Sequence, residues 1–344
     1  MLNITFNDDR TWLGTSFTIA TVALASFIIV LDISIFLRLL YYRKHSKGTS
    51  TSFSRSVGLM HSINTYIHLL GNTTVFLLMS SRTLVGDGSK LSDKLILASW
   101  HCRLLNCSMA MFSAGIYGSC FLQALFRFWR ITQSSQSRLT NYAFHCQLIV
   151  FHWLWIGLLA VPVWFRSVYV VEENYCFNPF IDPWSSVYIS STSVGIPLVA
   201  LILIYVKIVL FIKRNSRAPR RWRRIQRDVN IIRRILVLVL VLLCTSSGVV
   251  ILWISVYVQK RMHPLSYRWF CFMIVIGMLV CSVTLVLVSP QLRRALRSLR
   301  QHSKSPLPTP PVPPPVRSQP TKSHSPPKRM ISEELVSLAT DVSF

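Results

Sequence analysis

The chain has 344 residues, of which 51% are hydrophobic and 14% are charged; 37 Lys and Arg against 12 Asp and Glu give a formal net charge of +25. A soluble domain carries about 25% charged residues, so this composition is typical of a membrane protein. Eight cysteines in a chain of this length exclude a small secreted disulfide scaffold. The basic residues punctuate apolar runs instead of lining one folded face, which disfavours nucleic-acid binding.

Seven stretches are apolar enough to cross a bilayer, whose hydrocarbon core takes about 20 helical residues to span. Each is predicted to be a helix, because backbone polar groups cannot stay unpaired in lipid. The second and third stretches contain polar residues, among them His61, His68 and Asn106, and should therefore line an interior. We expect His61 and His68 to form interhelical hydrogen bonds. The predicted spans are 13–40, 57–81, 100–129, 146–168, 186–212, 231–257 and 267–288.

The sequence thus predicts an all-α membrane protein with four parts. A seven-transmembrane helix bundle over residues 13–289 follows an extracellular N-terminus of residues 1–12. Residues 290–301 place leucines on one face and arginines on others, which predicts a short amphipathic eighth helix on the membrane surface. Residues 302–344 are rich in proline and are predicted to form a disordered cytoplasmic tail.

Lysine and arginine concentrate in alternate connections, most heavily in the one between the fifth and sixth spans. Cytoplasmic loops carry this excess, so the N-terminus is predicted outside and the C-terminus inside, in a multi-pass plasma membrane protein. The Asn-Ile-Thr sequon at Asn3 agrees with that orientation. Two further sequons, at Asn72 and Asn106, fall within predicted helices and are interpreted as chance matches.

Two cysteines are placed on the outer side, Cys102 at the start of the third span and Cys176 in the loop after the fourth. The outside is oxidising, so a Cys102–Cys176 disulfide is expected; two unpaired thiols are the alternative. The other six cysteines fall in or beside spans and are interpreted as packing residues. No metal-ligand spacing, cofactor motif or catalytic constellation is found, so no metal, no cofactor and no enzymatic activity are predicted.

Further motifs follow the cysteines. Phe126-Arg127-Phe128 ends the third span, Trp153 or Trp155 lies in the fourth, and Pro197 and Tyr205 lie in the fifth. With seven spans and the cysteine pair, these residues resemble the rhodopsin-like (class A) G-protein-coupled receptors over residues 13–301. The chain is similar to a divergent member of that family. Its Arg127 lacks an acidic neighbour, its sixth span lacks proline, and its seventh lacks the family's Asn-Pro-x-x-Tyr.

The resemblance implies a receptor that binds an extracellular ligand and activates a heterotrimeric G protein through its inner face. Coupling residues would be Arg127, Phe126, Phe128 and Tyr205, with a helix kink at Pro197. A membrane-anchoring role is the alternative for Arg127. Since Phe126 cannot hold the arginine as an acid would, we expect raised ligand-independent activity.

The resemblance also implies a ligand pocket between the outer halves of the helices. Met109 replaces the aspartate of amine receptors, which disfavours cationic amines, and the seventh span has no lysine for retinal. Each pocket residue has simple packing as its alternative role. A neutral, peptidic or anionic ligand is open, and Lys260, Arg261 and Arg268 on the outer rim could attract an acid or an acidic peptide. The implied pocket residues are Asn106, Met109, Ala110, Ser113, Tyr117, Ser193 and Trp253.

Two other classes of protein remain open: a small seven-helix transporter or channel, and a receptor-like scaffold that no longer couples. Asp32 is the clear acid within a span, whereas transporters usually show repeats and several midplane charges. The expected partners are a G protein and membrane lipids. The tail offers Pro-x-x-Pro runs for SH3-type domains, a C-terminal Val342-Ser343-Phe344 for PDZ-type domains, and serines for arrestin-like proteins. No nucleic-acid partner is expected.

Overall fold

The computed structural model describes residues 8–45, 53–88, 95–132, 141–170, 175–177, 183–215 and 265–288, together with scattered residues between 237 and 258. All of them belong to one compact unit, Met1–Ser303, and the second unit, Lys304–Phe344, lies outside the described residues. Asn3, Trp253, the expected eighth helix and the tail also lie outside them.

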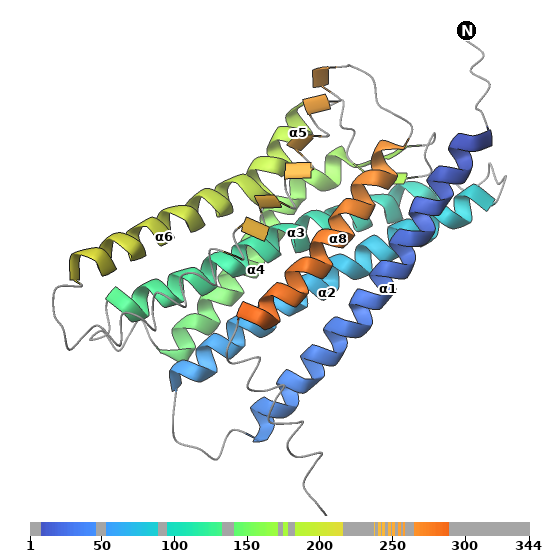
Figure 1. Ribbon diagram of the computed structural model, residues 1–344. Coiled ribbons are helices and arrows are strands. Elements are labelled where there is room, and N and C mark those ends of the chain that lie inside the picture. The colour runs from blue at the N-terminus through green and yellow to red at the C-terminus, as the bar shows by residue number, and fades with distance from the viewer. Residues whose placement is uncertain are drawn as a thin grey trace, which may run out of the picture. The chain divides into compact units, whose positions relative to one another are not determined.

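The described part is almost entirely helical, with a short antiparallel hairpin between the fourth and fifth helices (Figure 1). The hairpin pairs Tyr169 with Cys176. The elements in chain order are α1 (Asp8–His45), α2 (Phe53–Gly88), α3 (Leu95–Thr132), α4 (Tyr142–Arg166), β1 (Val168–Val170), β2 (Tyr175–Phe177), α5 (Pro183–Ile189), the π-helical segment η5 (Ser190–Gly195), α6 (Ile196–Asn215) and α8 (Ser266–Val288).

Five helical stretches of the described residues are long and apolar enough to cross a membrane, which makes the chain a multi-pass membrane protein. The predicted second span is helical within α2, but its polar residues keep it out of this apolar set. The sixth predicted span is described only at scattered helical residues. The five stretches are Trp12–Tyr41, Trp100–Arg130, Tyr142–Arg166, Trp184–Phe211 and Ser266–Leu287.

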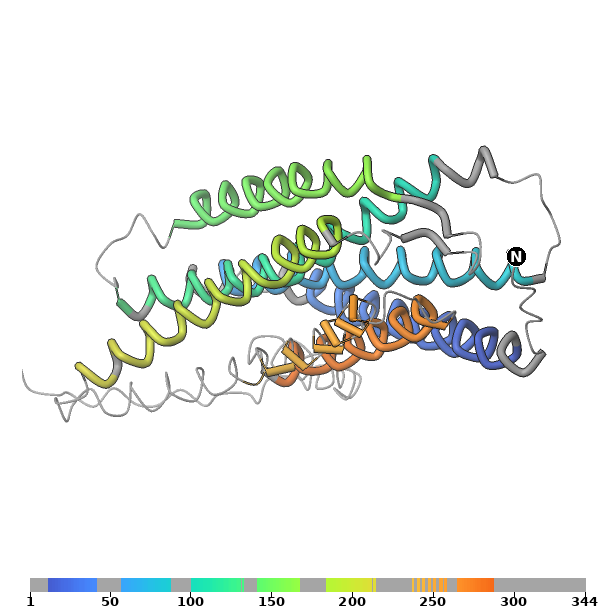
Figure 2. Tube along the Cα trace, turned by 90° about the horizontal axis from the view of Figure 1, so that it is seen from above, coloured from blue at the N-terminus to red at the C-terminus, as the bar shows by residue number. Residues whose placement is uncertain are grey.

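Helix α3 is the central helix of the described bundle. It packs against α2, α4 and α6, while α1 packs against α2 and α8 (Figure 2). The hairpin contacts one end of α3, which we call the hairpin end, and Arg127 lies near the other, which we call the arginine end.

Two apolar clusters fill the interior between these ends. The first reaches the arginine end and includes Leu39, Tyr205 and Leu285, from α1, α6 and α8. The second lies toward the hairpin end and includes Met109 and Tyr267. Because each cluster joins at least three helices, apolar packing fixes which helices are neighbours.

Local sequence explains two irregularities. Helix α4 begins where the Asn141 side chain accepts a hydrogen bond from the amide of Ala143, 3.2 Å away, as a helix N-cap does. The π-helical segment η5 ends just before Pro197. Proline cannot donate a backbone hydrogen bond and crowds the carbonyl four residues earlier, so a widened turn before Pro197 accommodates its ring.

Candidate functional site

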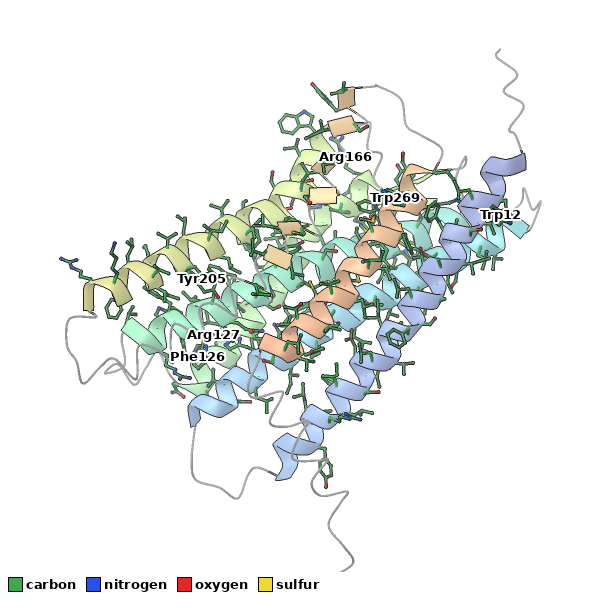
Figure 3. All side chains as sticks on the ribbon, in the orientation of Figure 1. Trp12, Phe126, Arg127, Arg166, Tyr205 and Trp269 are labelled. Carbon is green, nitrogen blue, oxygen red and sulfur yellow. The ribbon has the colours of Figure 1, made fainter. Side chains whose placement is uncertain are left out.

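Four predicted coupling residues lie at the arginine end of the bundle. Figure 3 shows Phe126, Arg127 and Tyr205 together there, with Trp12, Arg166 and Trp269 at the opposite end. Tyr205 is buried in the first apolar cluster, and Phe128 packs against that cluster. Arg127 is half-buried and lies within electrostatic range of the Tyr205 hydroxyl and of His61. The structure therefore brings together residues from α2, α3 and α6 around this guanidinium.

Phe126 points into a pair of histidines. Its ring centroid lies 5.0 Å from that of His145 on α4 and 5.9 Å from that of His61 on α2. The two histidines meet directly, with Nε2 of His61 3.2 Å from Nδ1 of His145. One imidazole must donate the proton of this hydrogen bond and the other must accept it. The expected interhelical role of His61 is confirmed.

Aromatic rings also surround His145 from other directions. Trp129 on α3 and Phe144 on α4 lie 6.1 and 5.7 Å from it between ring centroids, and 5.6 Å from each other. We call His61, Phe126, Trp129, Phe144 and His145 the ring cluster. It joins α2, α3 and α4 beside Arg127, so the position of α3 at this end depends on aromatic packing.

A second pair of histidines lies two turns away, toward the middle of the bundle. His68 on α2 and His152 on α4 are 5.4 Å apart between ring centroids. His68 stacks on Trp153 at 4.3 Å and has no hydrogen-bond partner among the described residues, so the interhelical bond expected of it is not found there. Trp153 donates from Nε1 to Oδ1 of Asn64, 2.9 Å away.

Two glycines of α3 make room for these imidazoles. A β-carbon on residue 115 would overlap with Nδ1 of His68, and one on residue 118 would overlap with Nε2 of His152. The close approach therefore requires residues without a side chain.

Polar contacts continue between α2 and α3. Nε2 of Gln123 donates to Oγ1 of Thr65 at 2.7 Å, and Oγ of Ser113 donates to Oδ1 of Asn72 at 3.3 Å. These contacts agree with the prediction that the polar residues of the second and third spans line the interior of the bundle. Asn72 and Asn106 are buried, and buried side chains cannot carry a glycan.

The predicted pocket residues do not share one set of neighbours in the structure. Nδ2 of Asn106 donates to Oγ of Ser167 at 2.7 Å, and that serine donates to the carbonyl of Val163 at 2.6 Å. Met109 is buried in the second apolar cluster, and Tyr117 packs against the first.

The other pocket candidates are also divided among elements. Ala110 is buried on α3, Ser113 bonds to α2 as described above, and Ser193 is buried in η5, which contacts α3. Asn106, Ala110, Met109 and Ser193 thus lie on or beside the half of α3 that leads to the hairpin end. Packing or an interhelical bond already accounts for Asn106, Met109 and Ser113.

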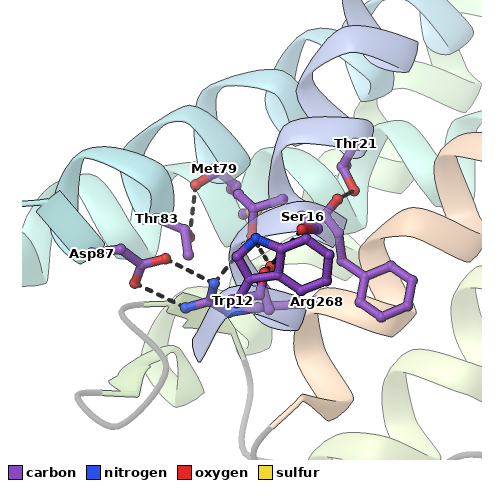
Figure 4. Close-up of polar contacts among 10 residues, drawn as sticks. Trp12, Ser16, Thr21, Met79, Thr83, Asp87 and Arg268 are labelled. Atoms are coloured by element: carbon purple, nitrogen blue, oxygen red, sulfur yellow. Dashed lines mark hydrogen bonds and ion pairs between the residues drawn. The ribbon is translucent and has the colours of Figure 1, made fainter. Parts of the chain in front are cut away.

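An ion pair holds three helices together near the hairpin end. Nη1 and Nη2 of Arg268 on α8 contact the two carboxylate oxygens of Asp87 on α2 at 2.7 and 2.8 Å (Figure 4). Nη1 also donates to Oγ1 of Thr18 on α1 at 3.3 Å. The charge of Arg268 is compensated within the protein, so it is not an open rim cation for an acidic ligand.

The cysteines fall into two groups. The described free thiols are Cys107, Cys120, Cys146, Cys244, Cys271 and Cys281. Cys102 is buried at the hairpin end of α3, and Cys176 belongs to β2, although its side chain lies outside the described ones. Among the described residues, no group of three His, Cys, Asp or Glu has the arrangement of a metal site.

His145 and His152 were not recognised from the sequence as part of this site. The signal was present, because His61 and His68 on α2 and His145 and His152 on α4 have the same seven-residue separation. Seven residues are close to two helical turns, so two packed helices with that spacing place their histidines in matching pairs.

No protein-family model matches the chain, and a search of curated proteins finds no relative of it.

Proposed function

We propose that the chain is a plasma-membrane receptor of the rhodopsin-like kind, with its hairpin end outside and its arginine end inside. The observation that carries this proposal is the grouping of Arg127 with Tyr205 at one end of α3, opposite Cys102 and the hairpin. A guanidinium half-buried between helices has donors available for a protein partner once the helices separate. The proposed partner is a heterotrimeric G protein.

The hairpin end supports an extracellular placement. We propose that Cys102 forms a disulfide with Cys176 and ties the hairpin to α3. Two observations support the pairing: Cys102 does not belong to the free thiols of the described residues, and α3 contacts both strands. Such a bond persists in an oxidising compartment.

The ligand of the proposed receptor is neither a cationic amine nor retinal. Met109 is buried among apolar residues, so an ammonium group at that position would lack a counter-charge. Helix α8 contains no lysine that could form a Schiff base.

In the proposed mechanism, movement of the sixth span uncovers Arg127 for the G protein. Phe126 packs into the ring cluster and contributes no charge, so no acidic neighbour on α3 restrains the guanidinium. The resting state is therefore held by packing, and the proposal includes ligand-independent activity. We also propose that the tail engages arrestin-like, PDZ-type or SH3-type proteins.

The test is nucleotide exchange on a panel of G proteins, using the full chain in lipid nanodiscs. Arg127→Ala should abolish the basal or evoked signal. Arg130→Ala is the matched control, because Arg130 lies one turn further along the same end of α3 and is exposed. Equal effects of the two substitutions would mean that Arg127 is only a membrane anchor. A well-folded wild type that activates no G protein contradicts the receptor proposal and leaves the transporter and the silent scaffold.

Orientation has an independent test. A glycosidase should shift the mobility of the wild-type chain and of Asn72→Gln but not of Asn3→Gln, because only a sequon on the lumenal side receives a glycan. The absence of a shift in wild type, together with antibody access to an extracellular C-terminal tag, would overturn the proposed orientation.

A further inference from the structure

Asp32 is a carboxylic acid in the interior of the bundle. Its side chain is 1% exposed, and neither carboxylate oxygen has a hydrogen-bond partner among the described residues. It belongs to the apolar stretch Trp12–Tyr41 of α1, which is long enough to cross a membrane. An isolated carboxylate in such surroundings is strongly unfavourable, and the group is expected to become neutral instead.

Among the described residues, no Lys, Arg or His lies close enough to Asp32 to interact with its carboxyl group. From α2 the titratable group facing it is Tyr66, whose hydroxyl donates to the backbone carbonyl of Ser282 at 3.1 Å. From α8 the nearby polar group is Ser282 itself, whose hydroxyl is fully buried. The Ser282 hydroxyl is close enough to interact with the Asp32 carboxyl group, although the two do not form a hydrogen bond of standard geometry.

The neighbourhood is otherwise apolar. Ile28, one turn before Asp32 on α1, belongs to the second apolar cluster, and Ile35, almost one turn after it, belongs to the first together with Tyr66 and Cys281. The carboxyl group is thus placed at the junction of α1, α2 and α8, which pack against one another. Among the described residues, the Ser282 hydroxyl is near enough to interact with a negative charge there, and it carries no positive charge of its own.

We propose that Asp32 is a proton-binding site: it holds a proton while α1, α2 and α8 are packed, and it releases that proton to solvent when their junction opens to water. The released proton leaves a carboxylate that water solvates, so no other reactant is needed. Opening of the junction is then favoured at higher pH. This proposal is independent of G-protein coupling.

Proton linkage gives the direction in which stability changes with pH. An aspartate in an unfolded chain ionises near pH 3.9, at about the value of a model peptide. If the packed protein keeps the proton above that pH, it binds more protons than the unfolded chain, and its stability falls as pH rises. One such site changes the unfolding equilibrium constant by up to about tenfold per pH unit over this range.

The experiment measures denaturant unfolding of the full chain in nanodiscs from pH 5 to pH 8. Asp32→Asn has nearly the same shape and no ionisable group. The number of protons released on unfolding, which the pH dependence of stability measures, should therefore fall by about one in this variant. Tyr66→Phe is the matched control, since it removes the titratable group of α2 that faces Asp32, and its unfolding should keep the pH dependence of the wild type. Identical pH dependence in wild type and Asp32→Asn would overturn the proposal.

A second measurement covers the case in which Asp32→Asn does not fold. Infrared spectra of the wild type at pH 6 should contain the carbonyl stretch of a buried protonated carboxylic acid, and Asp32→Glu should shift that band. Absence of the band would overturn the proposal. Sodium-dependent stabilisation of wild type at fixed pH, lost in Asp32→Asn, would also overturn it, because it would show that a metal cation neutralises the carboxylate.

Discussion

The indole of Trp153 on α4 donates a hydrogen bond to the side-chain oxygen of Asn64 on α2, across 2.9 Å. The same indole stacks on His68. Trp155, two residues later, is half exposed on the outer surface of α4. The two tryptophans that the sequence left as alternatives therefore have opposite roles, since Trp153 joins two helices and Trp155 faces outward.

We expect Trp153→Phe to reduce stability by about 1–3 kcal/mol, because it leaves the buried oxygen of Asn64 without its donor. Trp155→Phe should change stability by less than about 0.5 kcal/mol, as exposed substitutions usually do. Thermal unfolding of both variants in the same detergent checks the difference. Equal losses would show that the Asn64 bond does not contribute.

Gly115→Ala and Gly118→Ala should each destabilise the bundle by about 1–3 kcal/mol, the usual effect of overpacking an interior. The added methyl groups overlap with His68 and His152. Gly157 on α4 is the control, because a β-carbon there meets nothing within 4 Å. Gly157→Ala should be neutral or stabilising by up to about 1 kcal/mol through helix propensity. Thermal unfolding that ranks Gly157→Ala with the other two would contradict this account.

Asp87→Asn should lower stability by about 0.5–1 kcal/mol, which is the range for an ion pair that is not deeply buried. The side chains of Arg268 and Asp87 are 11% and 19% exposed to solvent. Arg268→Gln should give a similar loss, and combining the two substitutions should cost less than their sum. Unfolding measured at low and high salt tests this ion pair. Because salt screens the attraction, the difference in free energy of unfolding between wild type and each single variant should be smaller at high salt. A double variant that loses the full sum would show that the two side chains do not interact.

Phe126→Asp should lower basal G-protein activation per folded molecule, because a carboxylate beside Arg127 restrains the guanidinium. Phe126 is buried in the ring cluster, so part of any loss comes from packing. Phe126→Leu separates the two effects, since it removes the aromatic contacts without adding charge. Nucleotide exchange normalised to surface expression is the readout. If both variants reduce basal signalling equally, the charge plays no part.

The ring cluster marks the limit of prediction from sequence at the arginine end. Arg127 and Tyr205 stood out because of their positions in apolar stretches and the resemblance that those positions carry. The neighbours of Phe126 did not, because adjacent residues on a helix project about 100° apart, and sequence does not state what each direction meets. His145 belongs to the site because α4 packs beside α2 in the folded protein and brings it to His61, and this packing cannot be inferred from the sequence of either helix.

The outer rim shows the same limit. Sequence identified Arg268 as a cation without an acidic partner in its own loop, whereas the structure pairs it with Asp87, which is 181 residues away in the chain. Such a partner cannot be inferred from local charge counts.

Length and apolarity of single stretches identified the candidate membrane spans, five of which are long apolar helices among the described residues, because the cost of placing polar backbone in lipid depends only on the segment itself. Loop charges determined the expected orientation for the same local reason. The tertiary structure alone decided which polar side chains meet, as Asn64 and Trp153 do. It also decided which buried polar groups are left without a hydrogen bond among the described residues, as the Asp32 oxygens are. Lipid is as apolar as the helix surfaces, so the rotation of each helix is set by close packing and interhelical hydrogen bonds, which involve distant parts of the chain.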